Sequence, residues 1–126
     1  MTVNAHNDFV VAYLDELGAG LAACFDAMAL EIHENSRAHG WWDEERNDGE
    51  TIALMHSELS EALEAMRHGN PPDDHIPDFS GVEAELADVI IRIMDVAAAR
   101  GWRVGEAIVA KHAYNRTRPH KHGKAF

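Results

Sequence analysis

The stretch 50–67 reads ETIALMHSELSEALEAMR, and the stretch 81–100 reads GVEAELADVIIRIMDVAAAR. Each combines apolar residues at helical spacing with two carboxylates three positions apart. These carboxylates are Glu58, Glu61, Glu85 and Asp88. Residues three apart lie on one face of a helix, about one turn from each other. Carboxylates this close repel each other and contribute little to folding, so the spacing favours a divalent cation bound between them.

Two such helices packed face to face would offer all four carboxylates to one cluster of hard cations. Oxygen-rich sites of this kind favour Mg²⁺, with Mn²⁺ as a possible substitute. The alternative is that the carboxylates are only solvated surface, because a single E-x-x-E spacing is common by chance on helices. Two pairs on neighbouring helices, both beside apolar stripes, favour the metal interpretation.

Local signals predict where these two helices begin and end. Ser80 and Glu83 form a capping-box pattern that starts the second of them. Gly69 is the expected stop of the first helix and Gly101 that of the second. The connector 70–79 contains three prolines and cannot be regular helix. The chain therefore predicts two long helices, near 50–67 and from 80 to about 100, in antiparallel order.

The remaining sequence also indicates helices. Residues 4–36 have helical periodicity, but Gly18 and Gly20 leave open whether they form one helix or two. Gly40 is the expected C-terminal cap, and a shorter helix is expected over 104–116. No stretch alternates convincingly enough for a strand. The predicted fold is all-α, a four-helix-type bundle in one domain over 1–126, with a core of about 25–116 and a basic tail at 117–126.

Both acidic helices carry an apolar stripe that we expect to face the core. In the first helix the stripe consists of Ile52, Met55, Leu59, Ala62, Leu63 and Met66. In the second it consists of Val82, Leu86, Val89, Ile90, Ile93, Met94 and Ala97. Glu58 and Glu61 flank the first stripe, which predicts that they lie at the edge of the core.

Composition narrows the class of protein. Apolar residues make up 46% of the 126, as in a globular domain. No apolar run is long enough for a transmembrane helix, and the N-terminus lacks the pattern of a signal peptide, so we expect no membrane partner and a cytoplasmic location. Cys24 is the one cysteine, which excludes an intrachain disulfide; its surroundings predict a buried, inert thiol.

Charge is unevenly distributed along the chain. Residues 1–100 hold 21 acidic and 5 basic residues, a balance of −16, whereas residues 101–126 hold 1 acidic and 6 basic, a balance of +5; together these give the net charge of −11. A nucleic-acid partner is not expected, because phosphate backbones need a broad positive surface. The distribution suits a cation site in the body with anion-binding groups supplied by the tail.

The order of the acidic motifs resembles a known family. Glu58-x-x-Glu61, a connector and Glu85-x-x-Asp88 are similar to the E-x-x-E…E-x-x-D pattern of MazG-like nucleoside triphosphate pyrophosphohydrolases. These belong to the all-α NTP pyrophosphatase superfamily, together with dimeric dUTPases and dCTP pyrophosphatases. The connector looks longer than in compact MazG domains and resembles the dCTP-pyrophosphatase branch more.

Further positions extend the resemblance over roughly residues 25–120. Trp42 precedes Glu58 at the distance where dCTP-pyrophosphatase-like members carry a tryptophan near the base pocket. Lys111-x-x-x-Asn115-x-x-Arg118 resembles the basic and amide positions that follow the acidic helices in the MazG branch. If the last helix reaches that far, these three share one face. The alternative for them is a solvated basic helix end that complements the helix dipole.

The resemblance implies a function. The four carboxylates would hold Mg²⁺ and split a (deoxy)nucleoside triphosphate into the monophosphate and pyrophosphate, as nucleotide-pool house-cleaning. Lys111 and Arg118 would contact phosphate, Asn115 phosphate, sugar or base, and Trp42 the base. The resembled proteins are dimers or tetramers, which implies a homodimer or homotetramer here.

Several assignments stay open at the level of sequence. We expect one of the two tryptophans, Trp41 and Trp42, to pack in the core, and we assign contact with the base to Trp42. Glu64 is a supporting or solvated carboxylate, and Asp95 is a candidate for the site or a subunit interface. A non-catalytic nucleotide- or metal-binding regulator and an acidic helical interaction module are the alternative functions.

Overall fold

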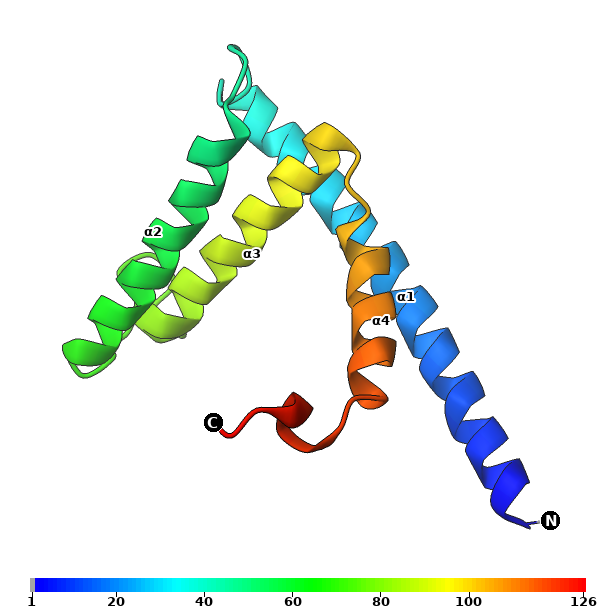
Figure 1. Ribbon diagram of the computed structural model, residues 1–126. Coiled ribbons are helices and arrows are strands. Elements are labelled where there is room, and N and C mark those ends of the chain that lie inside the picture. Colours follow the sequence, from blue (N-terminus) through cyan, green and yellow to red (C-terminus); the bar gives the residue numbers. More distant parts are fainter. Residues whose placement is uncertain (1) are drawn as a thin grey trace. The chain divides into compact units, whose positions relative to one another are not determined.

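The computed structural model describes residues 2–126, with side chains from residue 11 onward, and it is all-helical (Figure 1). Its elements are α1 (Thr2–Ala38), α2 (Asp48–Arg67), α3 (Gly81–Arg100), α4 (Val104–Arg116) and the short 3₁₀ helix η1 (His120–Gly123). Within the described residues there is no strand, only one isolated bridge between Pro72 and Ser80. None of the helices described has both the length and the apolar character to cross a membrane.

The chain divides into two compact units, and each is described by itself. One contains the residues up to Ala27 together with Arg103–Phe126, and the other contains Met28–Trp102. The second unit holds the end of α1 and all of α2 and α3, and therefore all four carboxylates of the acidic motifs. The prediction of a single domain over 1–126 stays a prediction.

The N-terminal helix is continuous, so Gly18 and Gly20 do not divide it. Its end follows the expected cap. Gly40 has φ +84°, a left-handed conformation that favours glycine. The Gly40 N–H donates to Arg37 O at 3.0 Å and the Trp41 N–H to Ser36 O at 3.2 Å. This pair of bonds is the Schellman motif, and it fixes where the chain leaves the helix.

The second helix begins two residues before the predicted Glu50. Asn47 is its N-cap, and the Asn47 side chain accepts a hydrogen bond from Glu50 N at 3.2 Å. The helix ends as predicted at Gly69, whose φ is +83°. The Asn70 N–H donates back to Ala65 O at 2.7 Å, which closes a second Schellman turn.

The predicted capping box of α3 is confirmed. Ser80 Oγ accepts from Glu83 N at 3.3 Å, and the Glu83 carboxylate accepts from Ser80 N at 2.8 Å. The connector before it is held by its own bonds: Asp73 accepts from the backbone of His75 and Ile76 at 2.8 and 2.9 Å. Helices α2 and α3 then run side by side in opposite directions (Figure 1).

The predicted apolar stripe of α2 is confirmed only in part. Met55 and Ala62 of that stripe are buried, together with Thr51 and Glu58, and these four follow one another at helical spacing. The leucine-rich part of the predicted stripe is exposed: Ile52, Leu59, Leu63 and Met66 are 44, 45, 49 and 61% exposed. A single partner helix covers only one face of α2, and the leucines lie on another. Glu58 consequently lies inside the α2–α3 interface and not at its edge.

The predicted stripe of α3 is likewise confirmed only in part, and the expected burial of Cys24 is wrong. On α3, Ala97 of the predicted stripe is buried together with Ala84, Asp95 and Val96, whereas Leu86 and Ile90 are 44 and 51% exposed. Cys24 is exposed and not buried. In each case a helix with few neighbours leaves apolar side chains uncovered.

In the other unit, α4 spans the predicted residues and packs closely on α1 through glycines. A β-carbon added at Gly18 would lie 2.7 Å from Val109 Cγ1, and one added at Gly105 would lie 3.1 Å from Phe25 Cβ. Glycine therefore brings the two helices into contact at both places. Gly18 is a packing residue, which explains a glycine within a continuous helix.

Candidate functional site

Three of the four motif carboxylates converge where α2 and α3 pack together. Glu58 and Glu61 from α2 and Glu85 from α3 each place an oxygen so that all three oxygens lie within 4.8 Å of one another. Glu58 is buried, Glu85 is partly buried and Glu61 is exposed. The i, i+3 spacing on α2 and the antiparallel pairing of the helices together produce this convergence.

An arginine balances the most buried of these carboxylates. Arg92 Nε and Nη2 each lie 2.6 Å from Glu58 Oε1. Burial alone would raise the pKa of Glu58, but the hydrogen bonds from Arg92 and Glu61 and the charge of Arg92 outweigh burial, so the pKa of this carboxyl is lowered. Glu58 is therefore the carboxylate of the cluster that ionises most readily.

The other members of the acidic motifs hold protons more strongly. The pKa of Glu61 is raised by its hydrogen bond with Glu58 and by the Glu58 charge. Burial, followed by the charge of Glu61, raises the pKa of Glu85 to about 7. Asp88 is exposed, but reduced hydration, followed by the charge of Glu58, raises its pKa. The three converging carboxylates Glu58, Glu61 and Glu85, here called the cluster, therefore carry more negative charge than the neighbouring Arg92 neutralises.

This geometry fits a hard divalent cation. Oxygens bound to one Mg²⁺ at about 2.1 Å lie about 3–4 Å apart, and rotation of glutamate side chains covers the remaining difference. A cation would also relieve the repulsion that raises the pKa values of Glu61 and Glu85. Asp88 does not belong to the converging set.

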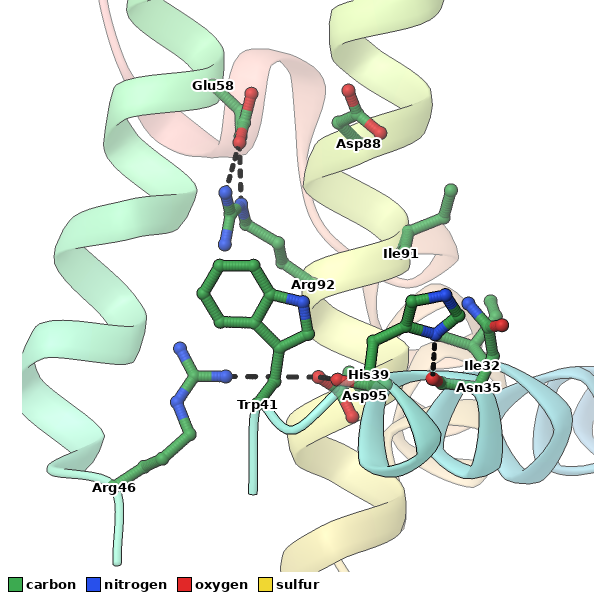
Figure 2. Close-up of a pocket in the computed structure, with 11 residues that line it drawn as sticks. Ile32, Asn35, His39, Trp41, Arg46, Glu58, Asp88, Ile91, Arg92 and Asp95 are labelled. Carbon is green, nitrogen blue, oxygen red and sulfur yellow. Dashed lines mark hydrogen bonds and ion pairs between the residues drawn. The ribbon is translucent and has the colours of Figure 1, made fainter. Parts of the chain in front are cut away.

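A pocket of about 370 Å³ adjoins the cluster (Figure 2). Both Glu58 and Asp88 line it, and in Figure 2 they lie at the same end, with Arg46 and Asp95 at the other. The pocket is also lined by Ile32, Asn35, Ser36, His39, Trp41, Ile91 and Arg92. Its volume is in the range of pockets that hold small molecules. A ligand in it would meet carboxylates and arginines from α2, α3 and the loop between α1 and α2.

The two adjacent tryptophans have different surroundings. Trp42 is partly buried, and its indole N–H donates to Asp95. The guanidinium carbons of Arg46 and Arg100 lie 5.1 and 5.7 Å from the Trp42 ring centroid, and the His33 ring meets it edge-on at 5.2 Å. Trp41 is 66% exposed and lines the pocket. Trp42 is therefore the more packed member of the pair, although it lines a second pocket with Glu34 and Asp43, and Trp41 is the one that lines the pocket beside Glu58. The contact of Trp42 with a base stays a prediction.

Asp95 connects the elements that surround the pocket. Its buried carboxylate accepts hydrogen bonds from His33 Nδ1 and Ser36 Oγ, both at 2.8 Å. It also accepts from Trp42 Nε1 and pairs with Arg46 Nη1 at 4.0 Å. The end of α1, the following loop and α3 therefore meet on one side chain. Asp95 therefore stabilises the residues that line the pocket, since both of its oxygens already accept hydrogen bonds from protein groups.

The predicted basic set lies in the other unit, so its approach to the carboxylates stays a prediction. Lys111 and Asn115 are on α4, but the helix ends at Arg116, and Arg118 therefore lies beyond the shared helical face that the sequence suggested. Lys111 and Arg118 still gather on one side chain: their cationic groups lie 5.4 and 5.7 Å from the Tyr114 ring centroid. Asn115 Oδ1 is shielded from solvent without a hydrogen-bond partner.

Sequence reasoning missed Arg92 and the exposed position of Trp41. Arg92 follows Asp88 by four residues, which places both on one face of α3. That spacing was a usable signal, because a cation one turn from a carboxylate pair is expected to face the same neighbours. No comparable signal separates Trp41 from Trp42.

Comparison of the chain with protein-family models, with curated proteins and with solved structures found no match.

Proposed function

We propose that this protein is a Mg²⁺-dependent nucleoside triphosphate pyrophosphohydrolase. The observation that carries the proposal is the convergence of Glu58, Glu61 and Glu85 within 4.8 Å, with Glu58 also lining a ligand-sized pocket. The order of the two acidic motifs, which resembles that of the MazG-like enzymes, supports it. Mn²⁺ is the expected substitute, because it shares the preference for carboxylate oxygens.

The residues have distinct roles in this proposal. Bound Mg²⁺ would neutralise phosphate charge and lower the pKa of a water for attack at the α-phosphorus. Glu58, Glu61 and Glu85 would hold the cation, and Asp88, which lines the pocket together with Glu58, would supply a further carboxylate to the cation or to the water. By the resemblance, Lys111 and Arg118 would contact the phosphates and Asn115 the phosphate, sugar or base; these three residues lie in the other unit, so their contact with the substrate stays a prediction. The leaving group is pyrophosphate, whose charge cations stabilise.

We place the base against Trp41, because this ring is exposed in the pocket whereas the Trp42 ring is engaged. Stacking on an aromatic face is tolerant of base identity and is worth about 1–3 kcal/mol. Trp42 would then support the site from behind by fixing the loop that carries Trp41.

We also propose that the protein works as an oligomer, a homodimer or a homotetramer. Among the side chains that the structure describes, from residue 11 onward, the buried apolar ones are few and mostly small: Phe25, Ala29, Met55, Ala62, Ala84, Val96 and Ala97. Large apolar side chains remain exposed on both acidic helices, among them Leu59, Leu63 and Ile90. A second copy that covers this surface would supply the burial that a chain of this size needs.

Product analysis tests the reaction. The protein is incubated with Mg²⁺ and each common ribo- and deoxyribonucleoside triphosphate, and the products are separated by anion exchange. We expect monophosphate and pyrophosphate from at least one of them. Diphosphate and phosphate would contradict attack at the α-phosphorus. Binding without turnover would support the non-catalytic regulator instead, and neither binding nor a Mg²⁺-dependent thermal shift would support the interaction module.

Two glutamine variants of α2 make the test specific. Glu61→Gln removes a ligand of the cluster and should abolish turnover. Glu64→Gln is the matched control, because Glu64 lies one turn further on the same helix and pairs with Arg67 at 3.6 Å and His68 at 3.3 Å outside the cluster. Equal loss of activity in both variants would show that the effect is not that of a metal ligand.

A further inference from the structure

Arg92 forms an ion pair with Glu58 and at the same time lines the pocket, so it can also contact a ligand. Its Nε and Nη2 both lie 2.6 Å from the same oxygen, Glu58 Oε1. The Glu58 side chain is 10% exposed and that of Arg92 is 36% exposed, so the arginine faces the pocket while its partner is buried. A pair with one solvent-facing cation is less strongly held than a fully buried one.

The pair also conflicts with cation binding. Glu58 belongs to the converging carboxylates, and a divalent cation on Glu58 withdraws negative charge from the oxygen that Arg92 contacts. Loading the cluster therefore weakens the hold of Glu58 on Arg92. The guanidinium then lies beside the cation site with donors that need a new acceptor.

Two arginines, Arg46 and Arg92, line the pocket, and Arg92 is the one more accessible to a ligand. Arg46 is tied to Asp95 and to the Trp42 ring, and its side chain is 19% exposed. Arg92 has its ion pair with Glu58 and is more exposed. A planar guanidinium donates two parallel hydrogen bonds to a phosphate, and arginine beside a metal stabilises charge that builds up during phosphoryl transfer.

We propose that Arg92 is a phosphate-binding residue that exchanges partners. In the cation-free protein it neutralises Glu58; once the cluster is loaded, it donates to the phosphate chain of the substrate. The exchange couples the two ligands, because the cation frees the arginine that the substrate uses. The phosphate half of the proposal rests on the proposed function, whereas the competition between Arg92 and the cation for Glu58 does not.

The test compares Arg92→Gln with Arg37→Gln. Arg37 lies in the same unit, its side chain is 58% exposed, and it pairs with Glu34 at 3.1 Å, so the control removes the same charge and a similar contact away from the pocket. Binding of Mn²⁺ without nucleotide is measured by electron paramagnetic resonance, and binding of inorganic triphosphate to the cation-loaded protein by calorimetry. KM and kcat are measured for any nucleotide that is turned over.

The proposal predicts opposite changes in the two affinities. Arg92→Gln should bind Mn²⁺ about threefold or more tightly, because a competing positive charge is gone. It should bind triphosphate at least about tenfold more weakly, the effect expected from losing a charge-assisted hydrogen bond. Arg92→Lys, which keeps the charge but not the planar pair of donors, should leave Mn²⁺ affinity near that of the wild type and weaken triphosphate binding. Arg37→Gln should change neither.

Other results would overturn the proposal. Tighter Mn²⁺ binding with unchanged triphosphate binding would mean that Arg92 only balances charge. A joint loss of both affinities with a lower melting temperature in both Arg92 variants would mean that the pair is structural. Absence of turnover with every nucleotide would count against the proposed function alone, since both binding measurements would still decide the role of Arg92.

Discussion

Trp42 and Asp95 are joined by a two-pronged hydrogen bond: the indole Nε1 lies 2.9 Å from Oδ1 and 3.1 Å from Oδ2 of the carboxylate. They belong to the loop after α1 and to α3, and the bond is partly buried. The same carboxylate receives His33 and Ser36 from α1. Asp95 thus links three segments of this unit by hydrogen bonds: the end of α1, the loop after it, and α3.

Removing this carboxylate should loosen the unit as a whole. We expect Asp95→Ala to lower the free energy of unfolding by about 3 kcal/mol, because several partly buried donors lose their acceptor at once. Asp95→Asn should cost less, since the amide keeps one oxygen. Urea unfolding followed by tryptophan fluorescence measures both. Asp78→Ala, at an exposed position of the connector, should change stability by less than about 0.5 kcal/mol. An unchanged urea midpoint in Asp95→Ala would contradict the assignment.

Glu85 predicts a pH dependence of stability in the cation-free protein. Its pKa rises from 4.5 to about 7 on folding, so the folded chain binds more protons than the unfolded chain between these values. The stability that Glu85 contributes is fully present below about pH 4.5 and is lost as the pH rises through about 7. We expect the melting temperature without cation to fall between pH 5 and 8 by a few degrees, on the order of the shift for 1 kcal/mol.

Two additions make this measurement specific to the cluster. Glu85→Gln should flatten the decrease, because the glutamine does not titrate. Saturating Mg²⁺ should raise the melting temperature most at the high end of the range, where Glu85 is ionised and free to bind it. A decrease of the same size in Glu85→Gln would assign the titration to another group.

Two glycines of α1 should respond in opposite ways to alanine. At Gly18 the new β-carbon would meet Val109 at 2.7 Å, so Gly18→Ala should destabilise the α1–α4 contact by about 1–3 kcal/mol. At Gly20 nothing lies within 4 Å, and Gly20→Ala should stabilise the helix by about 0.5–1 kcal/mol. Thermal unfolding by circular dichroism compares the two. Stabilisation by both would mean that Val109 does not press on α1.

The exposed leucines predict where a second copy docks. Leu63→Glu places a charge on the uncovered apolar face of α2 and should shift the oligomer toward the monomer in light scattering after size exclusion. Ala53→Glu adds the same charge on an exposed position of a different face of this helix and should leave the mass unchanged. A monomeric wild type would contradict the proposed assembly.

Helix boundaries in this protein could be predicted because they depend on neighbours in sequence. Ser80 and Glu83 cap α3 by bonds that span three residues, and Gly69 ends α2 through its own left-handed φ. The pairing of Glu58 with Glu61 on one face follows equally from helix geometry. These features need no knowledge of the partner helix.

Only the tertiary structure determined which side chains of each helix and loop face the neighbouring helix and which face solvent. The residues of α2 allow two apolar faces, one lined by leucines and one by Met55 and Ala62, and the rotation of the helix about its axis selects between them. The rotation found in the structure buries Glu58 against α3, brings Arg92 onto it and leaves the leucines outside. The same holds for the tryptophans, since only the position of Asp95 distinguishes Trp42 from Trp41. Local hydrogen bonds are specified by adjacent residues, whereas contacts between helices depend on the packing of both surfaces at once.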